Sequence, residues 1–249
     1  MKLSLITATY NSAETISNAI NSVRNQKIDN LEYIVIDGCS TDGTLEILKE
    51  NADIISKWVS EPDNGIYDAL NKGLKMASGE IVGFLHSDDS FANDRILQNI
   101  IDIFDMQPID FLYGDLEYIT SAEPYKVLRY WKSGYFTPKN LKKGWMPPHP
   151  TVYFKRNLID RIGQFNTSYS ISADYDWMMR CLTIPKLKVA YIPEVLIKMR
   201  TGGASNRSLK NIIKKSQEDY KIIRRNKIGN FITLLYKNFG KIGQFFKHD

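Results

Sequence analysis

Short apolar segments alternate with amphipathic ones through the first hundred residues, and this alternation restricts the fold more than any other feature of the chain. Four short segments rich in Ile, Val and aromatic residues have the character of buried strands: residues 3–9, 33–37, 54–59 and 81–85. Apolar residues recur at helical spacing in residues 12–24, 42–50, 66–76 and 94–104. Strands and helices that alternate in this way predict an α/β fold, a Rossmann-like, mostly parallel sheet with helices on both faces.

The pattern loosens after residue 110, where prolines interrupt it. We expect flanking loops, short helices at residues 158–162 and 174–181, and a closing pair of strands at residues 188–192 and 195–199. A longer helix is expected at residues 208–226. We therefore divide the chain into a main domain, residues 1–205, and a helical C-terminal tail, residues 206–249.

Charge is distributed unevenly between these two parts. The whole chain of 249 residues carries a formal net charge of +5, but residues 206–249 hold 11 Lys and Arg against 3 Asp and Glu. The main domain is therefore slightly acidic, which argues against nucleic acid as a partner because such binders carry basic charge on the folded domain. Two cysteines are too few for a disulfide framework and indicate a reducing, cytoplasmic setting.

Polar side chains follow each of the four predicted strands. Ligands of an open α/β sheet bind beyond the carboxyl ends of its strands. The residues at those ends are Thr9, Tyr10 and Asn11 after the first strand, Asp37 at the end of the second, Asp63 after the third, and Asp88 and Asp89 after the fourth. The glycine patterns of dinucleotide-binding and phosphate-binding loops are absent from the sequence, which excludes those two classes.

The acidic residues have both an ordinary and a functional interpretation. A residue near Asp42 can cap the next helix, but Asp37 ends a strand where no cap is needed, and its carboxylate can accept the imide N–H of uracil. The pair Asp88 and Asp89 is typical of a charged turn. At a ligand-binding edge it also suits Mg²⁺ or Mn²⁺, which bind one or two carboxylates together with phosphate oxygens.

Several segments taken together resemble a known family. They include Thr7-Ala8-Thr9-Tyr10-Asn11, Asp37-Gly38, Asp42-Gly43-Thr44, Ser60 to Gly73, Ser87-Asp88-Asp89, His149-Pro150, Gly163 to Asn166, Ala173-Asp174-Tyr175-Asp176 and Arg200 to Ser205. In this order and spacing, over residues 3–205, the chain resembles the inverting family 2 glycosyltransferases of the GT-A fold. Within them it is similar to the bacterial enzymes of exopolysaccharide, capsule and O-antigen synthesis.

The resemblance implies a role for each matching residue. Thr9, Tyr10, Asn11, Asp37 and Asp63 would bind the nucleotide of a nucleotide-sugar, a UDP-sugar in the first instance. Asp88 and Asp89 would hold Mn²⁺ or Mg²⁺, with Asp88 also near the donor. Asp174 would be the catalytic base of a metal-dependent hexosyl- or N-acetylhexosaminyltransferase. The chain departs from the family where His86 replaces the first aspartate of the metal motif.

Other assignments are weaker. Asp176 is a rival for the base, or, like Asp174, an acid that stabilises a helix start. His149 and Trp145 would lie on the acceptor side, and Arg200 would contact the diphosphate. Two alternatives stay open: a nucleotidyltransferase, although the loop after the first strand lacks the glycine-rich basic sequence it needs, and a non-catalytic nucleotide-sugar-binding module.

The tail mixes positive charge with apolar residues. Residues 208–226 fit a helix packed on the main domain, whereas the density of Phe, Leu and Lys in residues 229–247 favours a helix at a membrane interface. Because no stretch of about 18 apolar residues occurs, no membrane-spanning helix is expected. We therefore expect a peripheral protein on the inner face of the cell membrane, where lipid-linked saccharide acceptors lie in the resembled family.

Overall fold

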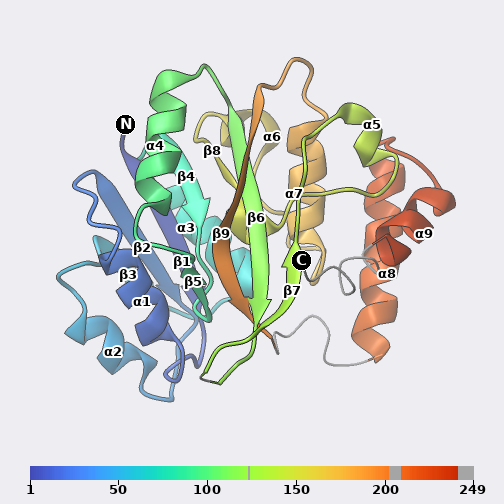
Figure 1. The fold of residues 1–249 in the computed structure, drawn as a ribbon. Helices are drawn as coiled ribbons and strands as arrows, with labels where there is room; N and C mark the ends of the chain where they lie inside the picture. The colour runs from blue at the N-terminus through green and yellow to red at the C-terminus, as the bar shows by residue number, and fades with distance from the viewer. Residues whose placement is uncertain (123, 202–208, 241–249) are drawn as a thin grey trace.

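The first half of the chain forms the parallel part of one mixed sheet (Figure 1). The computed structural model describes residues 1–122, 124–201 and 209–240. Its first four strands pair in parallel in the order β3-β2-β1-β4: β1 (Leu3–Thr9), β2 (Leu31–Asp37), β3 (Lys57–Ser60) and β4 (Ile81–Phe84). All four strands were predicted, although β3 begins three residues later than expected.

Four helices connect or follow these strands: α1 (Ile16–Arg24), α2 (Thr44–Glu50), α3 (Ile66–Met76) and α4 (Ile96–Met106). Right-handed crossovers place α1 and α3 on opposite faces, because the strand order runs outward from β1 to β3 and then returns to β4 (Figure 1). α3 lies very close to the sheet. A Cβ added at Gly73 would stand only 2.4 Å from Cγ2 of Ile6, so this position needs glycine.

The second half of the sheet is mixed. From β4 the strand order continues β8-β6-β9-β5, and β7 pairs with β6: β5 (Asp89–Phe91), β6 (Phe111–Ile119), β7 (Val127–Trp131), β8 (Tyr153–Lys155) and β9 (Val189–Arg200). The predicted pair of strands near the end is wrong, because the single strand β9 runs parallel to β6 through Pro193. Proline has no N–H for the ladder, and the register with β6 shifts at this point.

Short helices accompany these strands: α5 (Pro138–Leu141), the single-turn η1 (His149–Thr151), α6 (Leu158–Ile162) and α7 (Ala173–Leu182). The predicted helices at α6 and α7 are confirmed. Trp177 of α7 is fully buried, and its ring lies 4.6 Å from that of Phe154 and 5.7 Å from that of Phe165. These aromatic contacts fasten α7 to the sheet.

The last two helices, α8 (Leu209–Arg225) and α9 (Phe231–Phe239), pack beside α7 (Figure 1). Ile222 and Ile223 of α8 are fully buried, and Leu234 of α9 is 7% exposed. Asn230 begins α9 with a capping box. The predicted domain boundary at residues 205–206 and the tail beyond residue 240 lie outside the described residues. Among the described helices, none is both long and apolar enough to cross a bilayer.

Candidate active site

The carboxyl ends of β1 and β2 hold a buried carboxylate. Asp37 ends β2 opposite Thr9 in the register and is fully buried. One of its oxygens accepts hydrogen bonds from the Ser40 backbone N–H at 3.0 Å and the Ser60 hydroxyl at 2.6 Å, and the other accepts from the Ser40 hydroxyl. A carboxylate offers about four acceptor positions, so Asp37 can still accept one further N–H.

The side chains of Tyr10 and Asp63 both lie against Gly38, the residue that follows Asp37. A Cβ at Gly38 would lie 2.6 Å from Oδ2 of Asp63 and 3.3 Å from Cδ2 of Tyr10, so glycine is what allows the two side chains to approach. Tyr10 is 64% exposed. The hydroxyl of Thr9 is buried without a hydrogen-bond partner in the described structure. An exposed aromatic ring and unsatisfied polar groups at one sheet edge are suited to binding a planar base.

The loop after β1 is braced against the loops after β2 and β4. Asn11 adopts a left-handed backbone conformation with φ of 48°, and its side-chain oxygen accepts the Thr41 N–H at 2.9 Å. The hydroxyls of Ser12 and Ser87 are 3.0 Å apart. Asn11 therefore shapes the loop after β1, and the loop that carries the two adjacent aspartates is joined to that loop by the contact between Ser12 and Ser87.

The loop after β4 places its two carboxylates in different environments. Asp88 is partly exposed, whereas Asp89 lies on β5 and is 1% exposed, with no hydrogen-bond partner for either carboxylate oxygen among the described residues. Burial, and then the nearby charge of Asp88, raise the pKa of Asp89 well above its usual range. Asp88 is thus the accessible member of the pair.

Asp174 lies in the first turn of α7 and contacts Tyr67 of α3. The Tyr67 hydroxyl lies 3.1 Å from Oδ1 of Asp174 and donates to the Ile171 carbonyl at 2.6 Å. Burial is the main cause that raises the pKa of Asp174. Burial also lowers the pKa of His86, while the charges of Asp88 and Asp174 oppose that shift. His86, in the same loop as the two aspartates, is therefore close enough to both Asp88 and Asp174 to interact with them electrostatically.

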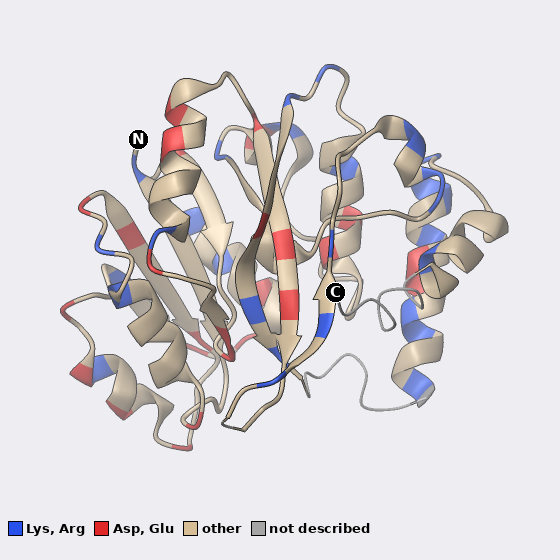
Figure 2. Cartoon of the chain, in the orientation of Figure 1, with Lys and Arg blue, Asp and Glu red and all other residues tan. Residues whose placement is uncertain are grey.

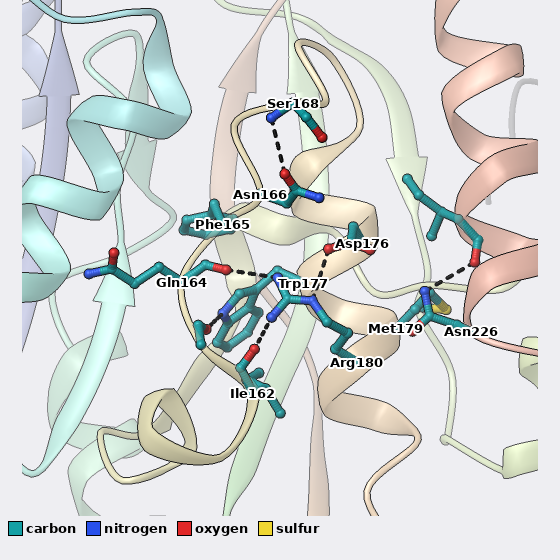
Figure 3. A network of polar contacts seen from close by, with 12 residues as sticks. Ile162, Gln164, Phe165, Asn166, Ser168, Asp176, Trp177, Met179, Arg180 and Asn226 are labelled. Carbon is teal, nitrogen blue, oxygen red and sulfur yellow. Dashed lines mark hydrogen bonds and ion pairs between the residues drawn. The ribbon is translucent and has the colours of Figure 1, made fainter.

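The carboxylate of Asp176 points toward Arg180 of the same helix (Figure 3). It is fully buried and accepts a hydrogen bond from Nε of Arg180 at 2.8 Å. The Arg180 guanidinium also donates to the carbonyls of Ile162 and Gln164, which ties α7 to the loop after α6. The carboxylate of Asp176 is buried here and one of its oxygens is paired with Arg180, so its contact with an acceptor stays a prediction that this arrangement does not support.

His149 is also internal. It is 6% exposed, and its ring stacks on Phe84 at 5.0 Å and lies 5.7 Å from the ring of His86. Burial lowers its pKa to about 3, so the ring is neutral. The imidazole packs against Phe84 and His86 in this structure, and the predicted direct contact with an acceptor stays a prediction that its burial does not support.

Trp145 is partly buried and lines a hollow of about 300 Å³ together with Tyr236 and Lys237 of α9. Its indole N–H donates to the Ser133 carbonyl at 2.8 Å. This hollow is open to a ligand, and Trp145 stays a candidate for the acceptor side.

Arg200 ends β9, next to Met199, which pairs with Asp89. Its guanidinium donates to the Tyr125 hydroxyl at 2.8 Å and lies 5.3 Å from the centre of that ring. The glycine loop that follows, residues 202–205, lies outside the described residues. Arg200 is therefore placed beside the aspartate loop, where a diphosphate contact remains a prediction.

The sequence profile of the family described as Glycosyl transferase family 2 matches residues 4–161. The chain belongs to this family. It is 30% identical over 208 residues to a PGL/p-HBAD biosynthesis glycosyltransferase of Mycobacterium bovis (strain BCG / Pasteur 1173P2). The alignment covers 82% of this chain and 78% of that protein. The protein is thus a family 2 glycosyltransferase, as the sequence motifs predicted.

Solved structures confirm the GT-A fold. S. aureus TarS superposes with a TM-score of 0.72 at 23% identity, covering 92% of this chain but only 39% of TarS. Residues 1–349 of TarS have been crystallised with UDP-GlcNAc. The mannosyltransferase PcManGT from Pyrobaculum calidifontis, solved with GDP-Man and Mn²⁺, has a TM-score of 0.67 at 19% identity and covers 98% of this chain and 70% of that one.

The aspartate loop of this glycosyltransferase suits a divalent cation. Asp89 holds a buried carboxylate whose oxygens make no hydrogen bond of normal geometry within the part of the chain that the structure describes, and Asp88 adds a second, more accessible carboxylate beside it. Within the described residues, no group of three or more His, Cys, Asp or Glu side chains is arranged to enclose a metal. A hard cation bound at Asp88 would therefore need oxygen ligands from a diphosphate and water, which Mg²⁺ and Mn²⁺ accept.

Three residues of this glycosyltransferase were missed by the sequence analysis: Tyr67, Glu218 and Lys237. Tyr67 lies inside a segment that matched the family, so its place there was an available signal. Glu218 and Lys237 look like ordinary helix charges in the sequence. Both are buried in the fold, at 6% and 4% exposure, and both contact residues on or next to α7.

Proposed function

We propose that this glycosyltransferase moves a hexosyl or N-acetylhexosaminyl group from a nucleotide-diphosphate sugar to a saccharide or lipid-linked saccharide acceptor in the synthesis of a bacterial surface polysaccharide. The observation that carries the proposal is the partly exposed carboxylate of Asp174, which lies 3.1 Å from the Tyr67 hydroxyl and within electrostatic reach of His86 in the aspartate loop. The fold, the base-binding edge and the family all agree with this assignment.

The nucleotide is assigned to the edge formed by Tyr10, Asp37 and Asp63. Asp37 has one acceptor position left, which suits the single imide N–H of uracil. Guanine offers a similar N–H, and the two structural neighbours were solved with UDP-GlcNAc and GDP-Man respectively. UDP is the first candidate, and GDP is the alternative that the binding test must distinguish.

In the transfer step the acceptor hydroxyl attacks the anomeric carbon from the face opposite the diphosphate. The carboxylate of Asp174 accepts the hydroxyl proton, and Tyr67 orients that carboxylate through its hydroxyl. The C–O bond to the diphosphate breaks with its electron pair, so the configuration inverts once. A divalent cation held by Asp88 and the diphosphate would offset the charge that develops on the leaving group.

The first test is a thermal-shift measurement with UDP, GDP and CMP, each with and without Mn²⁺. We expect one nucleoside diphosphate to stabilise the protein, and to do so more strongly with Mn²⁺ than without it. Release of that nucleotide from its sugar conjugates then identifies the donor. If none of the three nucleotides shifts the melting temperature, the proposed donor site is wrong.

We also propose that α8 and α9 attach the enzyme to an anionic membrane surface. Large apolar side chains of these helices are exposed, among them Ile213, Phe231, Ile232 and Phe239. A surface hollow of about 550 Å³ is lined by Lys142, Arg224 and Lys227 together with Ile232. Figure 2 shows further basic residues along α8. Apolar and basic side chains on one surface are typical of interfacial helices.

A further inference from the structure

Glu218 of α8 binds the turn that leads into α7 with both of its carboxylate oxygens. One oxygen accepts the N–H and the hydroxyl of Ser170 at 3.1 and 3.2 Å. The other accepts the N–H groups of Ile171 and Ser172 at 3.0 and 2.9 Å. These residues come directly before α7, whose second residue is Asp174.

This contact lies at the start of α7, where the helix has no side-chain cap of its own. Glu218 accepts the N–H of the N-cap residue Ser172 and of the two residues before it, so it fixes the turn that enters the helix. Ser172 stands at the N-cap position, but its side chain makes no capping hydrogen bond. The first N–H groups of a helix have no partner within the helix, and the positive end of the helix dipole favours a carboxylate nearby. Glu218 supplies that carboxylate from a helix about 46 residues further along the chain.

The same turn is held from its other side by the residue that contacts the base. The Ile171 N–H donates to Glu218, while the Ile171 carbonyl accepts the Tyr67 hydroxyl, which also lies 3.1 Å from Asp174. The peptide groups before and after Ile171 are therefore both held by hydrogen bonds, one to Glu218 and one to Tyr67. Tyr67 also connects this turn to the carboxylate of Asp174.

α8 is itself held rigidly enough to serve this purpose. Asp219, the next residue, pairs with Lys237 of α9 at 2.5 Å, and the Lys237 ammonium lies 3.9 Å from the centre of the Tyr175 ring. Ile222 and Ile223, one turn further along, are fully buried. The C-terminal helices thus contact α7 around Asp174 through two adjacent acidic residues.

We propose that Glu218 is a positioning residue for the catalytic carboxylate of Asp174, so that the C-terminal helices complete the active site. This inference rests on the proposed role of Asp174 as the base. A base displaced by about 1 Å from its acceptor can lose about 10²-fold in rate. Loss of the Glu218 contacts therefore affects turnover through Asp174 and leaves the edge with Tyr10, Asp37 and Asp63 unchanged, because the hydrogen bonds of Glu218 go to residues 170–172.

The test is a double-mutant cycle between Glu218→Gln and Asp174→Asn in the full chain. The Gln variant keeps the size of the side chain but turns one acceptor oxygen into a donor that faces backbone N–H groups. Calorimetry with UDP and Mn²⁺ gives the fraction of molecules that bind the nucleotide, and kcat is divided by that fraction. We expect the normalised kcat of Glu218→Gln to fall about 10- to 100-fold. The KM for the donor should change by less than about twofold. In the Asp174→Asn background the same substitution should cause no further loss.

Glu32→Gln is the matched control. Glu32 is also a buried carboxylate, 3% exposed, which accepts hydrogen bonds from Ser4 and Ser78, but it lies at the start of β2, away from the site. It should lower the melting temperature and leave the normalised kcat unchanged. If Glu218→Gln behaves like this control, or lowers kcat equally in both backgrounds, the positioning role is refuted.

Amide hydrogen exchange gives a readout that does not depend on turnover. Glu218→Gln should accelerate exchange at Ile171 and Ser172, and unchanged rates there would also refute the proposal. The proposed function fails separately: if Asp174→Asn alone keeps the wild-type kcat, Asp174 is not the base, whatever Glu218 does to the turn.

Discussion

The two sides of the active site are built in different ways. On the donor side, Asp37 receives hydrogen bonds from Ser40 and Ser60, three and 23 residues away, and the loops involved all follow neighbouring parallel strands. On the base side, Tyr67 meets Asp174 across 107 residues, and Glu218 reaches the turn before α7 from a helix at the end of the chain. The donor side is thus held by local turns and adjacent strand ends, and the base side by contacts between distant helices.

This difference shows where short sequence motifs can predict which residues share a site. Parallel strands bring their carboxyl ends to one edge, so short motifs after consecutive strands report a shared site directly. Contacts between α3, α7 and α8 depend on how the helices pack, and the residues that make them stand in no fixed spacing. Substitutions on the two sides should therefore separate donor binding from turnover.

The largest effect is expected at the base. Asp174→Asn should lower kcat about 10²- to 10⁴-fold, the range for loss of a general base, while the affinity for UDP with Mn²⁺ stays close to wild type. Because burial raises the pKa of Asp174, wild-type activity should be lost on the acid side at a higher pH than an ordinary Asp would give. Steady-state kinetics over a pH series, with calorimetry for the nucleotide, measure both.

Asp176→Asn is the control for that experiment. It should destabilise the protein through its lost ion pair with Arg180 but change the kcat of the folded molecules little. A larger loss of kcat in Asp176→Asn than in Asp174→Asn would assign the base to Asp176 instead.

The next effect separates the two adjacent aspartates on the donor side. Asp88→Asn should remove the stabilisation that Mn²⁺ adds to nucleotide binding, and transfer should be lost with it. Asp89→Asn should raise the melting temperature at neutral pH. The pKa of Asp89 is raised in the folded state, so the folded protein becomes less stable as the pH rises and this carboxyl group ionises in its buried position. An asparagine amide does not ionise and therefore avoids this loss of stability.

Thermal shifts with and without Mn²⁺ for each single variant provide the measurement, and the double variant should lose metal-dependent binding and transfer altogether. If Asp89→Asn abolishes the Mn²⁺ effect and Asp88→Asn retains it, the buried carboxylate is the metal ligand.

A smaller effect is expected on the outer surface of α8 and the α8–α9 connection. Replacing both Arg224 and Lys227 by Gln should weaken cosedimentation with phosphatidylserine vesicles at low salt by about 30-fold, because each basic residue near an anionic surface contributes about 1 kcal/mol. Lys49→Gln with Lys75→Gln removes the same charge from exposed positions on α2 and α3 and should leave binding unchanged.

Truncating the chain after Asn226 would be a poor test of the membrane surface. It would remove Lys237 and leave the buried Asp219 without its closest partner. If the two charge variants sediment equally, this surface does not bind membranes.

The smallest effect concerns stability behind the site. The pKa of His149 is about 3 in the folded protein, compared with about 6.5 for an unperturbed histidine. As the pH falls below about 6.5, His149 therefore takes up a proton in the unfolded chain but stays neutral in the folded one. The buried neutral ring should therefore cost about 2 kcal/mol of stability by pH 5. His149→Phe keeps an aromatic ring against Phe84 and should reduce the loss of melting temperature between pH 7 and pH 5. An equal loss in both proteins would mean that other groups cause it.

The sequence by itself determined the parallel part of the sheet, the edge at which its polar strand ends meet, and the family. Period and composition identified the strands that end at Thr9 and Asp37, and the alternation of strands with helices required their polar ends to meet at one edge. The motifs also singled out Asp174, because its neighbours in the chain matched the family.

Only the tertiary structure decided what surrounds these residues. It committed Asp176 to Arg180, buried His149 behind His86, and continued β9 through Pro193. It also brought Glu218 to the turn before Asp174 and buried Lys237 beside Asp219. Periodicity shows which face of a helix is apolar, but the packing of α7, α8 and α9 determines which charges lie between them, and those pairings join residues with no regular spacing in the chain.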